Sequence, residues 1–168
     1  DLDGVVRLAL DDTHKEAGIT PDRLETNPRG FFHGGCCDDL RALVSLTGAE
    51  IVLISTQRTQ VPTPQLLEAL QESNFPFDAL HDLWFAPVTD VSRTNDITTW
   101  LHLHGKPGIN WIVIDDEGRH YDSWQYQDRV LFVSGRYGLQ PTTAQKAATM
   151  LGVNQKQFIF QSTDDTTL

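Results

Sequence analysis

Side chains that could transfer a phosphoryl group occur at three places in this sequence. Two aspartates stand two residues apart, hydroxyl groups follow one apolar run, and an acidic pair follows another. Carboxylate oxygens are the ligands that Mg²⁺ prefers, and a carboxylate can attack phosphorus to form an aspartyl-phosphate. A second carboxylate can protonate the leaving group and then activate water, while a hydroxyl and a cation hold the phosphoryl oxygens. The three places are Asp1 and Asp3 in the string Asp-Leu-Asp-Gly, Ser55 with Thr56, and Asp115 with Asp116. Arg93, a candidate cation, lies between the last two.

The hydrophobic pattern predicts an α/β fold that would bring these side chains together. Short β-branched, apolar runs predict buried strands at 50–54, 111–114 and 129–133. The aromatic segment 75–88 is interrupted by two prolines and predicts one short strand or an extended segment. Helices that alternate with such strands indicate a mostly parallel sheet, and sites in such sheets form at the carboxyl ends of the strands. The predicted helices span 36–47, 63–73, 93–104 and 141–151.

Length and composition place the chain among acidic, soluble, single-domain proteins. Its 168 residues can bury a core without disulfides, so we expect one domain over 1–162, with short irregular elements at 5–35 and a flexible tail at 163–168. The net charge of −10 argues against strong non-specific binding to nucleic acid or anionic membranes. No apolar run is long enough to span a membrane. The two cysteines are adjacent and cannot join distant segments, which favours a reducing, cytoplasmic location.

The order of the motifs resembles that of the haloacid dehalogenase (HAD) superfamily, whose members are mostly Mg²⁺-dependent phosphatases. That family has an Asp-x-Asp motif, a Ser or Thr after a strand, a Lys or Arg, and an acidic pair after a strand. The strings TGAEIVLISTQR at 47–58, RTNDITTWL at 93–101 and IVIDD at 112–116 look most like the small HAD-like domain found alone in bacteria and within Swiss Army Knife RNA-repair proteins. The resemblance covers about residues 1–151. It implies a Rossmann-like three-layer fold without a separate cap domain.

Carried over by position, the resemblance implies a role for each residue of the motifs. Asp1 would be the nucleophile and Asp3 the general acid and base. Phosphate would be held by Ser55, Thr56, Arg58 and Arg93. Mg²⁺ would be held by Asp1, Asp3, Asp115 and Asp116. Two choices stay open at this point: Lys106 competes with Arg93 as the motif cation, and Arg58 is either an extra phosphate contact or one half of a surface ion pair.

The resemblance also sets two expectations about the whole domain. In the family an apolar strand leads into the Asp-x-Asp motif, so we expect a first strand to be missing upstream of residue 1. Without a cap the site would be open to bulky substrates, such as a nucleic-acid end or a phosphoprotein. The alternative is a catalytically inactive HAD-like module for binding or assembly. Retention of all the acidic motif residues favours the enzyme, because burying several like charges without a cation is costly.

Overall fold

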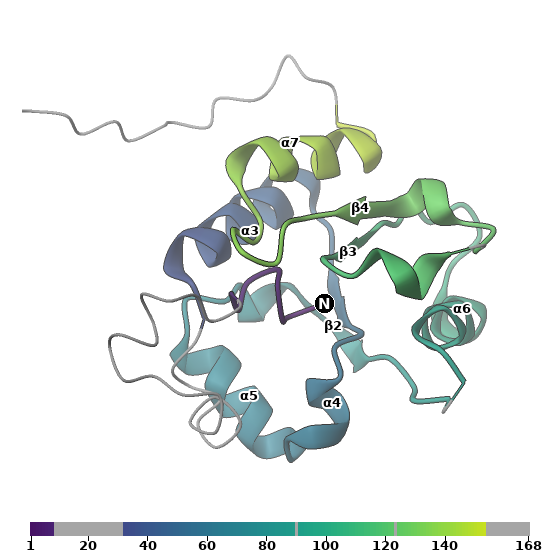
Figure 1. Cartoon of the computed structure of the whole chain (residues 1–168), viewed down its shortest axis with the longest axis horizontal. Helices are drawn as coiled ribbons and strands as arrows, with labels where there is room; N and C mark the ends of the chain where they lie inside the picture. The colour runs from purple at the N-terminus through teal and green to yellow at the C-terminus, as the bar shows by residue number, and fades with distance from the viewer. Residues whose placement is uncertain (9–31, 90, 123, 154–168) are drawn as a thin grey trace, which may run out of the picture.

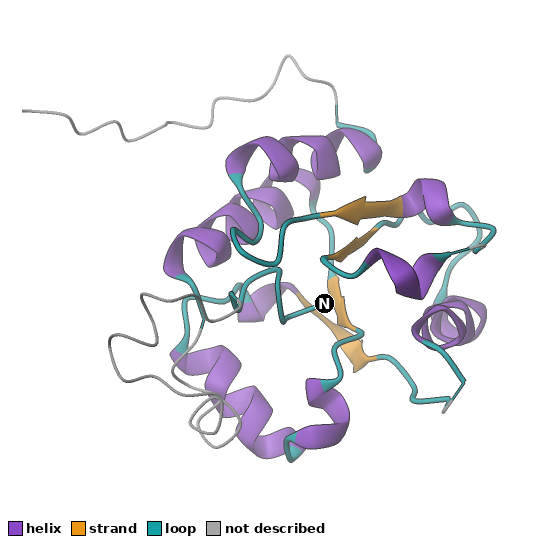
Figure 2. Ribbon diagram, in the orientation of Figure 1, coloured by secondary structure: helices purple, strands orange, loops and turns teal. Residues whose placement is uncertain are grey.

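Helices and short strands alternate along the chain, which confirms the α/β class (Figures 1 and 2). The computed structural model describes residues 1–8, 32–89, 91–122 and 124–153. The predicted tail and most of the irregular segment lie outside the described residues. The strands are β1 (Ile51–Leu53), β2 (Leu80–Phe85), β3 (Val113–Asp115) and β4 (Val130–Phe132). The α-helices are α3 (Gly34–Thr47), α4 (Gln57–Gln60), α5 (Thr63–Glu72), α6 (Arg93–His104) and α7 (Pro141–Met150). Short 3₁₀ turns are η2 (Phe77–Ala79), η3 (Gly118–Tyr121) and η4 (Gln127–Arg129).

Local capping sets the helix bounds, and α6 has the bounds that the sequence predicts. The Ser92 hydroxyl accepts the backbone N–H of Asn95 at 3.1 Å, and this bond starts α6 at Arg93. Helix α3 begins ahead of the predicted residue 36, because the ring of His33 accepts the backbone N–H of Cys36 at 3.3 Å. It ends where Gly48 takes the left-handed conformation, with φ 66°.

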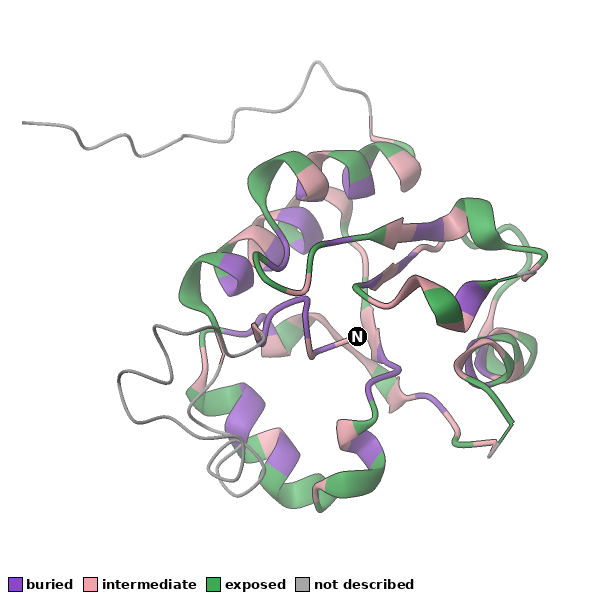
Figure 3. Ribbon diagram, in the orientation of Figure 1, coloured by how far each residue is buried: buried purple, intermediate pink, exposed green. Residues whose placement is uncertain are grey.

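The strands form two parallel pairs between two groups of helices. Strand β1 pairs with β2 and β3 pairs with β4, so the segment 75–88 does contain the predicted short strand. Figure 1 shows α3 and α7 side by side on one side of the strands and α6 on the other. Leu53 packs in the core beside α3 and α7, whereas Ile54 and Val113 pack beside α6. Figure 3 shows buried residues on the strands and on the helices to both sides of them. The parallel pairing is as predicted, while a single three-layer Rossmann-like sheet stays a prediction.

The adjacent cysteines on α3 belong to the core. Both Cys36 and Cys37 are fully buried. Burial raises the pKa of Cys36 to about 11 and that of Cys37 to about 12, so both stay protonated at neutral pH. They act as small apolar side chains rather than as nucleophiles. Among the described residues, no helix combines the length and the apolar character that crossing a membrane requires.

A largely apolar cavity of about 450 Å³ lies against both β1 and β3. Its walls include Ile51–Ile54, Trp111–Ile114 and Asp1. In the described part of the chain, β1 pairs only with β2 and β3 pairs only with β4. The other edge of each strand therefore has no strand hydrogen-bonded to it among the described residues. Among the lining residues, Asp1 donates from its α-amino nitrogen to the carbonyl of Ile114 at 2.8 Å. The cavity therefore offers backbone and apolar partners to an added strand.

We expect this cavity to accept an apolar strand that is added before Asp1. A variant with about four Val and Ile residues added before Asp1 should melt several degrees higher, since each buried apolar side chain contributes about 1.5–3 kcal/mol. A control extension of equal length, made of Gly and Ser, should leave the melting temperature unchanged. Equal melting of both extended variants would contradict this expectation.

Candidate active site

Arg93 connects the Asp-x-Asp motif with the acidic pair that follows β3. It is the first residue of α6, and its Nη1 donates to Asp1 Oδ2 at 2.6 Å and to Asp115 Oδ2 at 2.5 Å. Both carboxylates and the guanidinium are shielded from solvent, with exposed fractions of 6%, 0% and 9%. Lys106 is exposed and follows the opposite end of α6. Of the two candidate cations, the structure therefore brings Arg93 into the acidic cluster.

Three carboxylates converge where β3 ends beside the Asp1–Gly4 turn. Asp1, Asp115 and Asp116 each offer an oxygen, and these oxygens lie within 4.8 Å of one another. Asp116 is the exposed member and lies against two glycines. A Cβ on Gly4 or on Gly135 would overlap the Asp116 carboxylate, and Gly4 also has a positive φ of 69°. The glycine of the Asp-Leu-Asp-Gly string is thus required by space as well as by backbone conformation.

The members of the cluster shift one another's pKa values in opposite directions. Burial alone would raise the pKa of Asp115, but the positive α-amino group of Asp1, then the hydrogen-bond donors of Asp115 and then Arg93 hold it below its ordinary value. Burial and the neighbouring charge of Asp115 raise the pKa of Asp116. Burial lowers the pKa of Arg93, but Asp115 outweighs it and the net shift is upward. A divalent cation would relieve the repulsion between the adjacent carboxylates, because it favours the ionised form of both.

Asp3 lies beside this cluster and belongs to a different set of contacts. Its Oδ1 forms an ion pair with Arg7 at 3.2 Å, and its Oδ2 accepts the side-chain amide of Gln57 at 3.1 Å. Among the described residues, the group of converging carboxylates does not include Asp3, so its predicted role as a side-chain metal ligand does not fit this geometry. Its side chain is 44% exposed, which suits a group that must reach a substrate or water.

Ser55 and Thr56, the hydroxyl residues predicted to hold phosphate, lie on the turn after β1. Gln57 on the same turn donates a hydrogen bond to Asp3. Ser55 lies two residues after the end of β1 and is fully buried, and its Oγ accepts the backbone N–H of Gln57 at 3.3 Å. Thr56 is exposed at the start of α4, where its side chain makes no capping bond. The turn therefore places both hydroxyl residues next to the Asp-x-Asp motif. Their role in holding phosphate stays a prediction.

Arg58 does not fit its predicted role as a phosphate contact, nor does it form a surface ion pair. It is buried, and its Nε donates to the carbonyl of Ser55 at 2.9 Å. Its Nη1 donates to the carbonyl of Ala86 at 2.7 Å and its Nη2 to Asp96 Oδ2 at 2.8 Å. Because each guanidinium nitrogen already has a protein acceptor, Arg58 joins the turn after β1 to α6 instead of facing a ligand.

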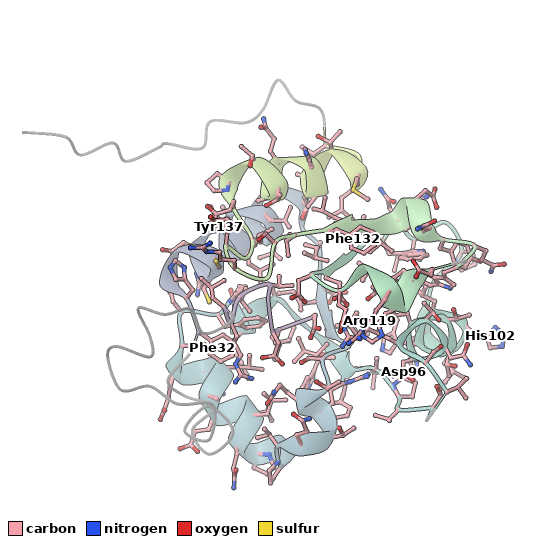
Figure 4. All side chains as sticks on the ribbon, in the orientation of Figure 1. Phe32, Asp96, His102, Arg119, Phe132 and Tyr137 are labelled. Atoms are coloured by element: carbon pink, nitrogen blue, oxygen red, sulfur yellow. The ribbon has the colours of Figure 1, made fainter. Side chains whose placement is uncertain are left out.

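Asp96 is the buried partner that sequence reasoning missed (labelled in Figure 4). Besides Arg58 it accepts the backbone N–H of Thr89 at 2.8 Å and the Thr89 hydroxyl at 2.7 Å. These bonds fix the first turn of α6, which carries Arg93. Asp96 thus helps to position the cation of the site.

Substituting Met for Arg58 is expected to lower the free energy of unfolding by about 3–5 kcal/mol, because it leaves Asp96 buried without its charged partner. Urea unfolding of the parent chain and of Arg58→Met measures the difference. The matched control is Arg119→Met, which removes an arginine that is 76% exposed and should cost less than about 1 kcal/mol. An equal loss of unfolding free energy in the two variants would show that the bonds of Arg58 do not stabilise the fold.

A second residue without a sequence signal is Tyr121, the last residue of η3. Its hydroxyl donates to Asp115 Oδ2 at 2.5 Å, and the backbone N–H of Glu117 donates to Asp115 Oδ1 at 2.9 Å. Burial and the charge of Asp115 raise the pKa of Tyr121, so its hydroxyl keeps the proton that it donates.

An α/β fold with three converging aspartates and an arginine at the strand ends has the parts that HAD-type sites use. A family model described as the HAD domain in Swiss Army Knife RNA repair proteins matches residues 1–144, and the chain belongs to this family. Searches of curated proteins and of solved structures give no significant match. Membership implies a possible phosphatase or hydrolase activity, and the aspartate group offers a place where a metal ion could bind.

Proposed function

We propose that this domain is a Mg²⁺-dependent phosphomonoesterase that works through an aspartyl-phosphate. The observation that carries the proposal is the convergence of oxygens from Asp1, Asp115 and Asp116 within 4.8 Å of one another, with Arg93 bonded to two of these residues. Hard oxygen donors of this kind fit Mg²⁺, which binds proteins through a few carboxylates and keeps other positions for water and phosphate. Membership of a HAD family supports the same cation and reaction class.

Bound by the three aspartates, Mg²⁺ would neutralise negative charge on the phosphoryl group. The Asp1 carboxylate attacks phosphorus, and a new bond forms from phosphorus to Asp1 as the bond to the leaving oxygen breaks. Asp3, in its protonated form, gives a proton to that leaving oxygen. Asp3 then takes a proton from a water molecule, whose oxygen attacks phosphorus. The bond to Asp1 breaks, and inorganic phosphate leaves.

The other residues of the site hold the phosphoryl group during both steps. Arg93 pairs with Asp1 in the free protein and can turn one donor toward the phosphoryl oxygens, which its fork of N–H groups suits. Ser55 and Thr56 offer hydroxyls on the turn beside Asp3. Donors placed where negative charge develops stabilise the transition state, commonly by about 3–4 kcal/mol for each donor.

We further propose that the substrate is a phosphorylated nucleic-acid end. The description of the matching family names RNA repair proteins, and both Asp3 and Asp116 are reached by solvent, which suits a bulky substrate. With a net charge of −10, recognition would depend on the terminal phosphate rather than on a basic surface along the strand. Oligonucleotides with 3′ or 5′ phosphates, compared with small phosphate esters, test this choice by their relative rates of phosphate release.

The reaction class is tested with a generic aryl phosphate. We expect phosphate release that requires Mg²⁺ and stops when EDTA is added. Folded protein that releases no phosphate and whose melting temperature does not rise with Mg²⁺ would contradict the proposal. That outcome would favour the inactive binding or assembly module instead.

A further inference from the structure

We infer that Tyr121 is a positioning residue for the cation site, an inference that rests on the proposed function. Tyr121 is fully buried, and its hydroxyl donates to Asp115 Oδ2 at 2.5 Å. Asp115 is itself fully buried and is one of the three converging carboxylates. Tyr121 therefore acts on a cation only through Asp115, by fixing the direction in which that carboxylate presents its free oxygen positions.

The hydrogen bonds of Asp115 leave it little freedom. Its Oδ1 accepts the backbone N–H of Glu117 at 2.9 Å, and its Oδ2 accepts both Tyr121 and Arg93 at 2.5 Å. An ionised carboxylate has about four acceptor positions, so these donors leave about one for a cation. Rotation of the carboxylate would break all of these bonds together. The orientation seen here is thus the one that a bound cation would meet.

The three donors to Asp115 differ in how firmly they are held. Arg93 is shared with Asp1, and in the proposed reaction it turns toward phosphoryl oxygens. The ring of Tyr121 is packed between neighbours: its centroid lies 5.9 Å from that of Phe132 and 5.7 Å from that of Trp124. Phe132, labelled in Figure 4, is also the register partner of Asp115 across the β3–β4 ladder. The Tyr121 hydroxyl therefore stays in place when Arg93 moves.

Tyr121→Phe tests the inference because it keeps the packed ring and removes only the hydroxyl. Loss of a group that orients a metal ligand typically weakens metal binding by about 10–100-fold. We expect a shift of this size in the Mg²⁺ dissociation constant, measured by calorimetric titration at a temperature where each variant is folded. The matched control is Tyr126→Phe, which removes an exposed tyrosine hydroxyl from the same aromatic group and should leave Mg²⁺ binding unchanged.

A second measurement uses the parent chain and does not depend on how Tyr121→Phe folds. The chain has three tyrosines, so fluorotyrosine labelling gives a simple ¹⁹F spectrum that single Tyr→Phe variants assign. Addition of Mg²⁺ should shift the Tyr121 resonance and leave those of Tyr126 and Tyr137 in place. A purely structural tyrosine would show no such shift.

The outcomes separate this inference from the proposed function. A parent chain that binds no Mg²⁺ overturns both. A parent chain that binds Mg²⁺, with equal affinity in Tyr121→Phe or with an unmoved Tyr121 resonance, overturns the positioning role alone and leaves the cation site intact. Weaker binding in Tyr121→Phe together with the resonance shift supports the inference.

Discussion

Replacing Asp1 by Asn is expected to lower Mg²⁺-dependent phosphate release by at least about 10³-fold, because the amide cannot attack phosphorus. The substitution also removes one of the three carboxylates that converge on the cation site. In addition, Asp1 Oδ2 accepts Arg93 at 2.6 Å and Oδ1 accepts the N–H of Leu2 at 2.7 Å. An amide can satisfy only one of these two donors, so Arg93 loses part of its support.

The control for Asp1→Asn is Asp82→Asn. Asp82 is exposed on β2, outside the acidic cluster, so this variant removes the same charge without touching the site. Initial rates on an aryl phosphate at saturating Mg²⁺ compare the two variants with the parent chain. Asp82→Asn should keep the parent rate. An Asp1→Asn variant that keeps it as well would exclude Asp1 as the nucleophile.

Replacing Gly4 by Ala should disable the site almost as fully, for two separable reasons. The left-handed conformation of Gly4, with φ 69°, costs an alanine about 1–2 kcal/mol. The new Cβ would also overlap the Asp116 carboxylate, so Asp116 must leave its place beside Asp1 and Asp115. We expect weaker Mg²⁺ binding and a loss of phosphate release of at least about 10²-fold, since a ligand displaced from a metal site removes its transition-state stabilisation.

Gly108→Ala separates these two reasons. Gly108 has a comparable φ of 79°, but a Cβ there would meet open space. Its alanine variant should lose about 1–2 kcal/mol of stability and keep full Mg²⁺ binding and activity. The loss in Gly4→Ala beyond this control measures the contact with Asp116. Parent-like Mg²⁺ binding in Gly4→Ala would show that Asp116 does not need its present position.

The site residues that could be predicted from the sequence are those that lie at the ends of regular helices and strands. Asp115 ends an apolar strand and Arg93 begins a capped helix, so periodicity and capping signals place both of them. Because parallel strands direct their carboxyl ends to one edge, the meeting of these residues could be expected before the structure. Bonds between Arg93 and the two carboxylates agree with that expectation.

The parts that sequence reasoning missed depend on contacts between distant residues. Arg58 follows a Ser-Thr turn, and its position suits a phosphate ligand as well as it suits an ion pair. Only the folded chain brings Asp96 and the carbonyl of Ala86 to its guanidinium. Gln57 and Tyr121 likewise reach Asp3 and Asp115 through side-chain bonds that no local pattern signals. Helix α4 is only 4 residues long, too short to show a helical period.

The most direct test of the central claim is to locate the phosphoryl group on the protein during turnover. Asp3→Asn should still accept a phosphoryl group from a reactive aryl phosphate but should release it slowly, because it lacks the base that activates water. After acid quench and proteolysis, mass spectrometry should find one phosphoryl group on Asp1 in the presence of Mg²⁺ and none when EDTA is present. A phosphoryl group on a residue other than Asp1 would contradict the account. So would an active parent chain combined with an Asp3→Asn variant in which Asp1 carries no phosphoryl group.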